Sequence, residues 1–346
     1  MKTKELYFHE AINQAIKQSI QKDNKVIHCG LGVDDPKGVF GTTLDLHKKF
    51  KKNIFDMPTA ENSMTGIALG ISLEGYRPII VHQRVEFSLL SLEQIINQIA
   101  KWRFMSGGKN KVSLVIRLII GKGWGQGPQH SQSLEVLFSH IPGLKVVCPS
   151  NPLDAKGMLI ESIFDNNPVI FFEHRWLHGT KSYVPEKFFK KDITKAKVLR
   201  KGKDLTIISY SNALIETLKA SDFLNKNNIN AEVIDLRVLR PLDKKTLIKS
   251  AKKTKKVLIV DNGMIEYGIS SEISSLLYEN IKKVEVHRIG VKDVPIPSTV
   301  SLAKLCYPEI TTIVNKVLKI LNKKVKDKIP ERKNPDQPDI SFRGPF

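Results

Sequence analysis

The sequence contains little cysteine and no long apolar run. Its three cysteines, Cys29, Cys148 and Cys306, are too few and too far apart for a disulfide framework or a zinc site. No apolar segment approaches the ~20 residues that a transmembrane helix needs, and the first residues lead into an amphipathic segment rather than an apolar signal core. These absences predict a cytoplasmic protein without a membrane segment.

Motifs for the binding of nucleotides and nucleic acids are also absent. The glycine-rich stretch GKGWGQG, from Gly121 to Gly127, lacks the G-x-G-x-x-G spacing of dinucleotide-binding folds, and no G-x-x-x-x-G-K-[ST] loop occurs. The net charge is +20, from 55 basic and 35 acidic residues. The excess is mostly lysine scattered along the chain, with no basic helix interleaved with aromatic residues. We therefore expect solvated surfaces and no nucleic-acid partner.

Short apolar strands alternate with helices along the chain, beginning with a helix expected over residues 5–20. Such alternation predicts the α/β class, with parallel sheets covered by helices on both faces. The pattern occurs twice, and 346 residues agree with about two domains. The expected divisions are residues 1–175 for the first α/β unit, 176–197 for a polar linker, 198–321 for the second unit and 322–346 for an extended, proline-rich tail.

His130 lies directly after the glycine-rich loop, between an apolar run that ends at Ile120 and a helix expected from about residue 132. This places it at the C-terminal end of a strand, where open α/β sheets bind their ligands. A neutral imidazole there could transfer protons near pH 7. A loop histidine that is hydrogen-bonded to the backbone is an equally good explanation of this loop alone.

Glu61 stands at or near the start of another predicted helix, after the connection Met57-Pro-Thr-Ala60. A carboxylate in the first turn of a helix usually interacts with the helix dipole. Taken alone, Glu61 is therefore more simply explained as a helix-start residue than as a catalytic one.

A co-linear series of motifs runs through both halves of the chain. It consists of Phe55-Asp-Met-Pro-Thr-Ala-Glu61, Gly75-Tyr-Arg-Pro78, Ser106-Gly-Gly108, His130-Ser-Gln132, Ile141-Pro-Gly-Leu-Lys-Val-Val147, Asp154-Ala-Lys-Gly157, Asp165-Asn-Asn-Pro168, Val233-Ile-Asp-Leu-Arg237 and Arg240-Pro-Leu-Asp243. The series resembles the beta subunit of thiamine-diphosphate-dependent 2-oxoacid dehydrogenases, such as pyruvate dehydrogenase and the branched-chain enzyme. The resemblance covers about residues 5–320 and implies a transketolase-like pyrimidine-binding domain followed by a transketolase C-terminal domain.

The resemblance implies roles for three residues. Glu61 is similar to the glutamate that hydrogen-bonds the aminopyrimidine ring of the cofactor, and His130 to the histidine near the reacting substrate. Phe87 matches an aromatic residue beside the ring, although an ordinary core phenylalanine is the alternative. The implied reaction is oxidative decarboxylation of a 2-oxo acid with acyl transfer to lipoamide, in which the cofactor acts as the electron sink. Such an enzyme is an oxidoreductase with a disulfide acceptor.

A structural potassium site is also implied by the resemblance. Carbonyl oxygens form most of that site, and hard oxygen ligands suit such a cation. A plain loop is the alternative. The implied positions are Leu114, Ser162, Ile163, Asp165 and Asn167.

One motif of thiamine-diphosphate enzymes is absent, because no Gly-Asp-Gly occurs in the chain. In those enzymes this motif binds the Mg²⁺ that holds the diphosphate. The resemblance therefore implies that an alpha subunit supplies the metal and the diphosphate half of the cofactor. It also implies a heterotetramer of two alpha and two beta chains, inactivity of this chain alone, and a lipoyl acyltransferase as a further partner.

Two positions depart from the family pattern. Gly30-Leu31-Gly32-Val33 stands where many members have Gly-Glu-Asp-Val or Gly-Glu-Glu-Val, so the acidic path between two active sites is interrupted unless Asp34 or Asp35 substitutes. Arg84 replaces an apolar or small residue near the pocket. It could pair with an additional carboxylate of the substrate, or with Glu86.

Two alternative functions stay open. A thiamine enzyme without a lipoyl acceptor, such as a decarboxylase, a transketolase-like protein or an acetoin-type dehydrogenase, would use the same motifs. The presence or absence of a lipoyl acyltransferase partner would separate it from the dehydrogenase. The other alternative is a non-catalytic scaffold subunit of the same fold, against which the retention of Glu61 and His130 argues.

Overall fold

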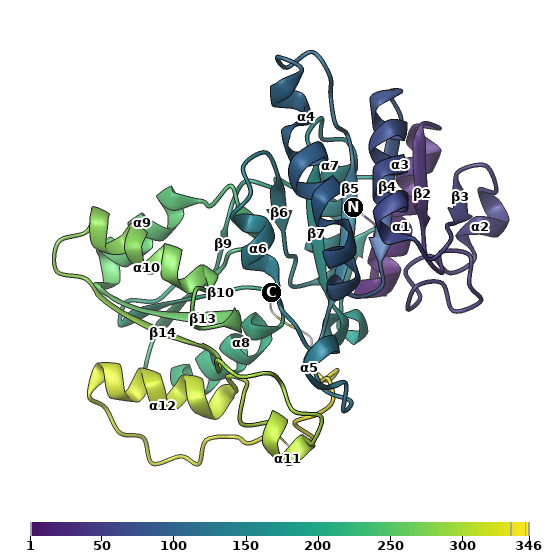
Figure 1. The fold of residues 1–346 in the computed structure, drawn as a ribbon. Helices are drawn as coiled ribbons and strands as arrows, with labels where there is room; N and C mark the ends of the chain where they lie inside the picture. Colours follow the sequence, from purple (N-terminus) through teal and green to yellow (C-terminus); the bar gives the residue numbers. More distant parts are fainter. Residues whose placement is uncertain (1, 333, 343, 345–346) are drawn as a thin grey trace. The chain divides into compact units, whose positions relative to one another are not determined.

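The computed structural model describes residues 2–332, 334–342 and 344. These residues form two compact units, both built from strands that alternate with helices (Figure 1). Of these residues, unit 1 contains 2–121, 137–193, 340–342 and 344, and unit 2 contains 122–136, 194–332 and 334–339. The predicted α/β class with two parallel sheets is confirmed.

Unit 1 is built on a parallel sheet. Its strands in spatial order are β6 (Lys145–Val147), β7 (Val169–His174), β5 (Val115–Ile120), β4 (Arg77–His82), β2 (Val26–Gly30) and β3 (Ile54–Asp56). Every residue of the central strands β5 and β7 is buried. Both faces of the sheet are therefore covered, as the near-continuous apolar runs in these strands require.

Helices and one small ladder complete unit 1. α1 (Phe8–Lys22) packs against α7 (Pro152–Ile163), and α3 (Glu61–Leu73) packs against β4. The helix expected over residues 5–20 begins only at Phe8, because β1 (Thr3–Tyr7) pairs antiparallel with β8 (Lys181–Pro185). The shorter helices are α2 (Leu46–Lys49), η1 (Val85–Ser91), η2 (Gln94–Ile99), α4 (Ala100–Met105) and η3 (Arg175–Gly179), and α6 (Glu135–Ser139) spans the boundary between the units.

A buried charge network joins three strands of unit 1. Arg117 of β5 is fully buried, and its Nε lies 2.5 Å and its Nη2 3.0 Å from the two carboxylate oxygens of Glu173 in β7. The Arg117 Nη1 lies 3.0 Å from Nε2 of His28 in β2, and its Nη2 donates to the Thr42 hydroxyl at 2.8 Å. The guanidinium thus meets acceptors on every side, which is what a charge in a dry core requires.

Unit 2 is built on a second sheet, which is parallel except for one edge strand. Its strands in spatial order are β14 (Glu285–Val291), β13 (Lys256–Met264), β10 (Leu205–Ser209), β11 (Ala231–Asp235) and the antiparallel β9 (Lys197–Arg200). The short segment β12 (Val238–Arg240) follows β11 in the chain.

The two faces of the sheet in unit 2 carry different helices. Leu205 and Ile207 of β10 belong to the apolar cluster formed with α8 (Ser211–Lys226) and α12 (Ile310–Leu321). Between them, the Thr206 hydroxyl points to the opposite face, where it lies 2.9 Å from the hydroxyl of Thr254 in α9 (Lys244–Thr254). The period of two along β10 therefore separates the two helix layers. α10 (Ile269–Asn280) packs against α9, and the short helices are α5 (Gly127–His130) and α11 (Val300–Ala303).

None of the helices in the described ranges is both long enough and apolar enough to span a bilayer. The described residues after α12, 322–332, 334–342 and 344, form neither helix nor strand, yet Val325 and Ile329 pack against the apolar cluster of unit 2. Two side chains of this segment are therefore packed against unit 2, although the segment has no regular secondary structure in its described part.

The buried His28 makes the stability of unit 1 depend on pH. Burial lowers the pKa of His28 to about 3, and the charge of Arg117 acts in the same direction. Since an unfolded chain protonates a histidine near pH 6.5, the unfolded state binds the additional proton between about pH 6.5 and 3. The free energy of unfolding therefore falls as the pH drops through this window, by up to about 1.4 kcal/mol per pH unit for one histidine.

We expect His28→Gln to flatten the dependence of the unfolding free energy on pH between pH 6 and 4, measured by urea unfolding at several pH values. His82 (pKa lowered to about 4 by burial) and His178 (lowered) would leave part of the slope in place. The exposed His140 provides the control, because His140→Gln should leave the slope as it is in the natural protein. Equal slopes in all three proteins would contradict the assignment.

Candidate active site

Glu61 is the first residue of α3, at the end of the connection that follows β3. The Ala60 N–H donates to the Pro58 carbonyl at 2.7 Å, which closes the turn before the helix. Glu61 is half-buried, and in the described part of the chain its carboxylate has no hydrogen-bond or ion-pair partner. Because β3 is a strand of the parallel sheet, the carboxylate lies near the carboxyl edge, where such sheets bind ligands.

Phe87 lies in η1, the helix that follows β4, and is half-buried. Its N–H donates to the Arg84 carbonyl at 3.2 Å, within the turn that starts η1. Since η1 packs against α3, the structure brings Glu61 and Phe87 onto two neighbouring elements of unit 1. A carboxylate and an aromatic ring of this kind suit a polar heteroaromatic ring as ligand.

His130 ends the short helix α5 in unit 2 and is half-buried. The glycine-rich loop before it uses left-handed backbone at Gly123 (φ 80°), Gly125 (φ 64°) and Gly127 (φ 71°). At Gly127 a β-carbon would lie only 2.6 Å from the Ser298 hydroxyl, so glycine lets the loop approach that serine. Glu61 and Phe87 thus belong to unit 1, whereas His130 belongs to unit 2.

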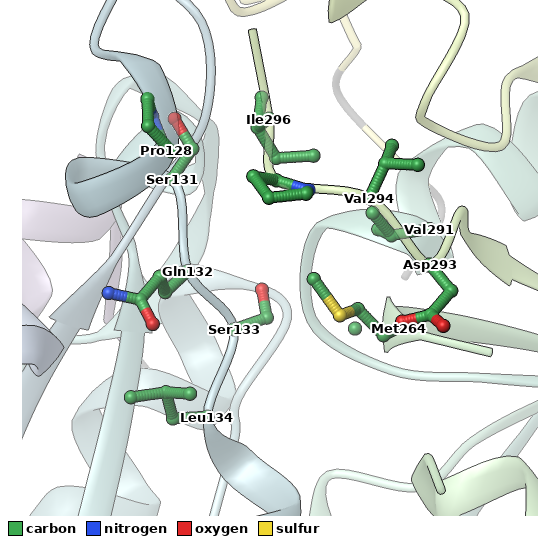
Figure 2. Close-up of a pocket in the computed structure, with 12 residues that line it drawn as sticks. Pro128, Ser131, Gln132, Ser133, Leu134, Met264, Val291, Asp293, Val294 and Ile296 are labelled. Atoms are coloured by element: carbon green, nitrogen blue, oxygen red, sulfur yellow. The ribbon is translucent and has the colours of Figure 1, made fainter. Parts of the chain in front are cut away.

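A cavity of about 390 Å³ lies beside the His130 loop, and all of its walls belong to unit 2. Figure 2 shows Gln132, Ser133 and Leu134 along one wall, with Met264 and Asp293 across from them. The lining as a whole is mostly apolar, and its polar side-chain groups are two serine hydroxyls, the Gln132 amide and the Asp293 carboxylate. Such a lining suits a small organic group with few polar atoms.

Glu135, five residues after His130, and its partner Asn262 were not identified from the sequence. Asn262 Nδ2 donates to Glu135 Oε1 at 2.9 Å. Burial raises the pKa of Glu135 to about 7, against the opposing effect of its hydrogen bonds from the backbone and from Asn262. The position of Glu135, five residues after His130, could have marked it as a candidate site residue. Its partner Asn262 lies on β13, more than one hundred residues later in the sequence, and could not be inferred from local pattern.

The implied potassium ligands lie in unit 1, and two of their carbonyls converge. The Arg77 Nη1 donates to the carbonyl oxygens of Ile163 and Asp165, at 3.2 Å each. Of the other positions, the carbonyl of Leu114 accepts from the Val169 N–H at 2.9 Å. The oxygens therefore suit a cation, but an arginine already donates to two of them.

Side chains at Asn167 and Ser162 are also engaged in unit 1. The Asn167 Oδ1 accepts from Arg103 Nη1 at 2.5 Å, and its Nδ2 donates to Asp165 Oδ1 at 2.9 Å. The Ser162 hydroxyl donates to the Met158 carbonyl at 2.7 Å.

The two departures from the family pattern also lie in unit 1. The Leu31 carbonyl accepts from Gln83 Nε2 at 2.9 Å, and Asp34 and Asp35 are exposed. Arg84 is half-buried. Burial of Arg175 is the main cause that lowers the pKa of Arg175, and the positive charge of Arg84 lowers it further. Two guanidinium groups thus act on each other in one region of unit 1.

Two domain families match the chain in the expected order. The transketolase pyrimidine-binding domain matches residues 4–180, and the transketolase C-terminal domain matches residues 194–313. A solved structure titled "Split gene transketolase, inactive beta4 tetramer" covers 92% of this chain and 100% of its own, with a TM-score of 0.77 and 23% identity. At that identity the likeness shows the fold alone.

Curated relatives cover nearly the whole chain at higher identity. The beta subunit of acetoin:2,6-dichlorophenolindophenol oxidoreductase from Cupriavidus necator is 38% identical over 88% of this chain and 94% of its own. The beta subunits of the pyruvate dehydrogenase E1 component from Porphyra purpurea and Rickettsia felis are 38% and 35% identical, over 92% and 90% of this chain and 97% of their own. The chain therefore belongs to the family of transketolase-like beta subunits that includes those of pyruvate dehydrogenase and acetoin oxidoreductase.

Proposed function

We propose that the chain is the beta subunit of a thiamine-diphosphate-dependent 2-oxoacid dehydrogenase of the pyruvate dehydrogenase type. The observation that carries this proposal is the Glu61 carboxylate. It stands half-buried at the start of α3, without a partner among the described residues, inside the segment that matches the pyrimidine-binding domain. A carboxylate left available in this way suits the ring nitrogen of an aminopyrimidine.

The cofactor, when bound, supplies a nucleophilic carbon and an electron sink for the loss of carbon dioxide from a 2-oxo acid. In our proposal Glu61 holds a proton at the ring nitrogen of the pyrimidine, and the Phe87 ring packs beside it. His130 moves a proton at the substrate oxygen, since an imidazole both accepts and donates protons near neutral pH. The apolar side chains around the cavity next to His130 exclude water from the acyl group.

An alpha subunit is the partner that the proposal requires. The sequence lacks Gly-Asp-Gly, so Mg²⁺ and the diphosphate would be held by that subunit, in an assembly of two alpha and two beta chains. The names of the relatives as beta subunits support a multi-subunit complex. Exposed apolar side chains on α3, η1 and α4 support it as well, because such surfaces are usually covered in assemblies; they are Ile67, Leu90, Phe104 and Met105.

The proposal extends to the acyl acceptor, the location and a cation. A lipoyl acyltransferase would take the acyl group, in the reaction class with a disulfide acceptor, and the buried free thiols agree with a cytoplasmic location. Potassium at Leu114, Ser162, Ile163, Asp165 and Asn167 stays a prediction. An ion there would compete with the Arg77 guanidinium for two carbonyls.

An acetoin-type reaction is the second candidate. The relative from Cupriavidus necator, which is named for acetoin and an artificial acceptor, favours it. The two candidates share Glu61 and His130, so they differ in the substrate that the assembled complex turns over. A panel containing 2-oxo acids and acetoin would separate them.

We expect Glu61→Gln and His130→Ala each to lower kcat by about 10²–10⁴-fold, the range in which a positioned proton-transfer group contributes. The measurement is artificial-acceptor reduction by the chain assembled with its alpha subunit, thiamine diphosphate and Mg²⁺. Glu74→Gln, at the exposed opposite end of α3, is the matched control and should keep the natural rate. Turnover within twofold of the natural protein after Glu61→Gln would remove the proposed role of that residue.

Arg84 provides a test of the substrate class. If its guanidinium pairs with a second carboxylate, Arg84→Met should lower kcat/KM for a dicarboxylic 2-oxo acid by about 10–100-fold, the worth of one charged hydrogen bond. The same change should alter kcat/KM for pyruvate by less than about threefold. The exposed Lys101 provides the control, as Lys101→Met removes a charge from unit 1 elsewhere. An equal loss of kcat/KM with both acids would show that Arg84 does not bind the second carboxylate.

A further inference from the structure

The chain beyond α12 returns along unit 2 and is held there by charged side chains. We call residues 325–332 and 334–339 the strap. The Arg332 Nη1 lies 3.5 Å from Glu216 Oε1 of α8, and the Lys219 Nζ on the same helix lies 2.6 Å from Asp339 Oδ2. The side chains of Arg332 and Glu216 are only 7% and 4% exposed. The strap is thus anchored at two points, one of them buried.

Lys122, in the glycine-rich loop, is buried where the charges of Glu216 and Arg332 act on it. Lys122 is 6% exposed, and its Nζ lies 4.3 Å from the centre of the Tyr307 ring. Burial lowers the pKa of Lys122 to about 8, against the effect of the nearby Glu216 and Glu309. Charged groups of both signs gather here: the cations are Lys122, Lys219, Lys304 and Arg332, and the carboxylates are Glu216, Glu309 and Asp339.

The backbone of the strap also holds the loop directly. The Trp124 N–H donates to the Asp336 carbonyl at 3.1 Å. The Arg332 Nη2 donates to the Gln337 carbonyl at 2.5 Å, which fixes the strap next to that contact. At Gly127 the same loop closely approaches Ser298. His130 comes three residues later, at the end of α5.

We propose that Arg332 is a positioning residue for His130: through Glu216 and the backbone of the strap, it fixes the loop from Lys122 to His130 in its working conformation. The inference rests on the proposed function only for the part that His130 plays. The match to the C-terminal domain family ends at residue 313, so the strap lies outside it. The contact between Arg332 and Glu216 is therefore not part of the matched domain.

The test compares three variants in the complex with the alpha subunit, thiamine diphosphate and Mg²⁺. Arg332→Met removes the buried charge and should lower kcat about tenfold while KM stays within about twofold, because the loop is misplaced rather than the substrate site removed. Amide hydrogen exchange over residues 122–130 should speed up about tenfold. Arg332→Lys, which retains the charge, should restore most of kcat. Lys328→Met, at an exposed lysine of the strap, should change neither quantity.

The exchange measurement separates this inference from the proposed function, since it requires no turnover. Unchanged exchange over residues 122–130 after Arg332→Met would overturn the inference, whatever the activity. Faster exchange with unchanged kcat would overturn it as well. If the single variant fails to fold, Glu216→Gln combined with Arg332→Met removes one charge of each sign and should give the same two effects. A loss of activity in His130→Ala with normal exchange over residues 122–130 would support the proposed role of His130 in catalysis and would leave the positioning role of Arg332 to be decided by the Arg332→Met exchange.

Discussion

The buried ion pair between Arg117 and Glu173 is the constraint on which the arrangement of unit 1 depends. It crosses from β5 to β7, while the same guanidinium reaches His28 on β2 and the Thr42 hydroxyl. Burial alone would raise the pKa of Glu173, but the charge of Arg117 holds it at about 2, so the pair stays ionised. Separation of the two charges would cost a large free energy, because each would be left unpaired in a core without water. The relative positions of these strands are thereby fixed, and with them the starting points of the loops that follow.

Each unit carries some of the residues of the proposed chemistry. These residues lie on loops or at helix starts that follow strands of the sheets. In unit 1, Glu61 follows β3, and Phe87 follows β4 on a helix that packs against α3. In unit 2, the loop that carries His130 closely approaches Ser298 at Gly127, and its Trp124 N–H donates to the Asp336 carbonyl of the strap. The rigid sheets supply position and the connecting segments supply the functional groups, which is the usual division of roles in α/β proteins.

The fold was predictable to a large extent, because alternating strands and helices of the right length signal a parallel sheet directly. Glu61 at the first position of α3 followed from local pattern in the same way. Local pattern failed where a partner is remote: Thr3–Tyr7 is a strand only because it meets Lys181–Pro185, and Glu135 owes its environment to Asn262. The strap is a further example. Its charged, proline-rich composition does not predict that Arg332 pairs with Glu216, which lies more than one hundred residues earlier in the sequence. The roles of Glu61, Phe87 and His130 and the potassium positions came from resemblance and stay predictions.

The position of Arg332 in the chain has a consequence for biosynthesis. The ribosome adds this residue about two hundred positions after Lys122, which at ordinary translation rates is a delay of ~10–40 s. In the second half of that interval α8 has been synthesised as well as the glycine-rich loop, but Glu216 lacks the guanidinium that lies beside it in the finished unit. If the strap fixes the loop as we propose, the loop that carries His130 reaches its final form only at a late stage of synthesis, after both sheets can fold. A nascent chain would acquire its architecture first and its ordered site afterwards.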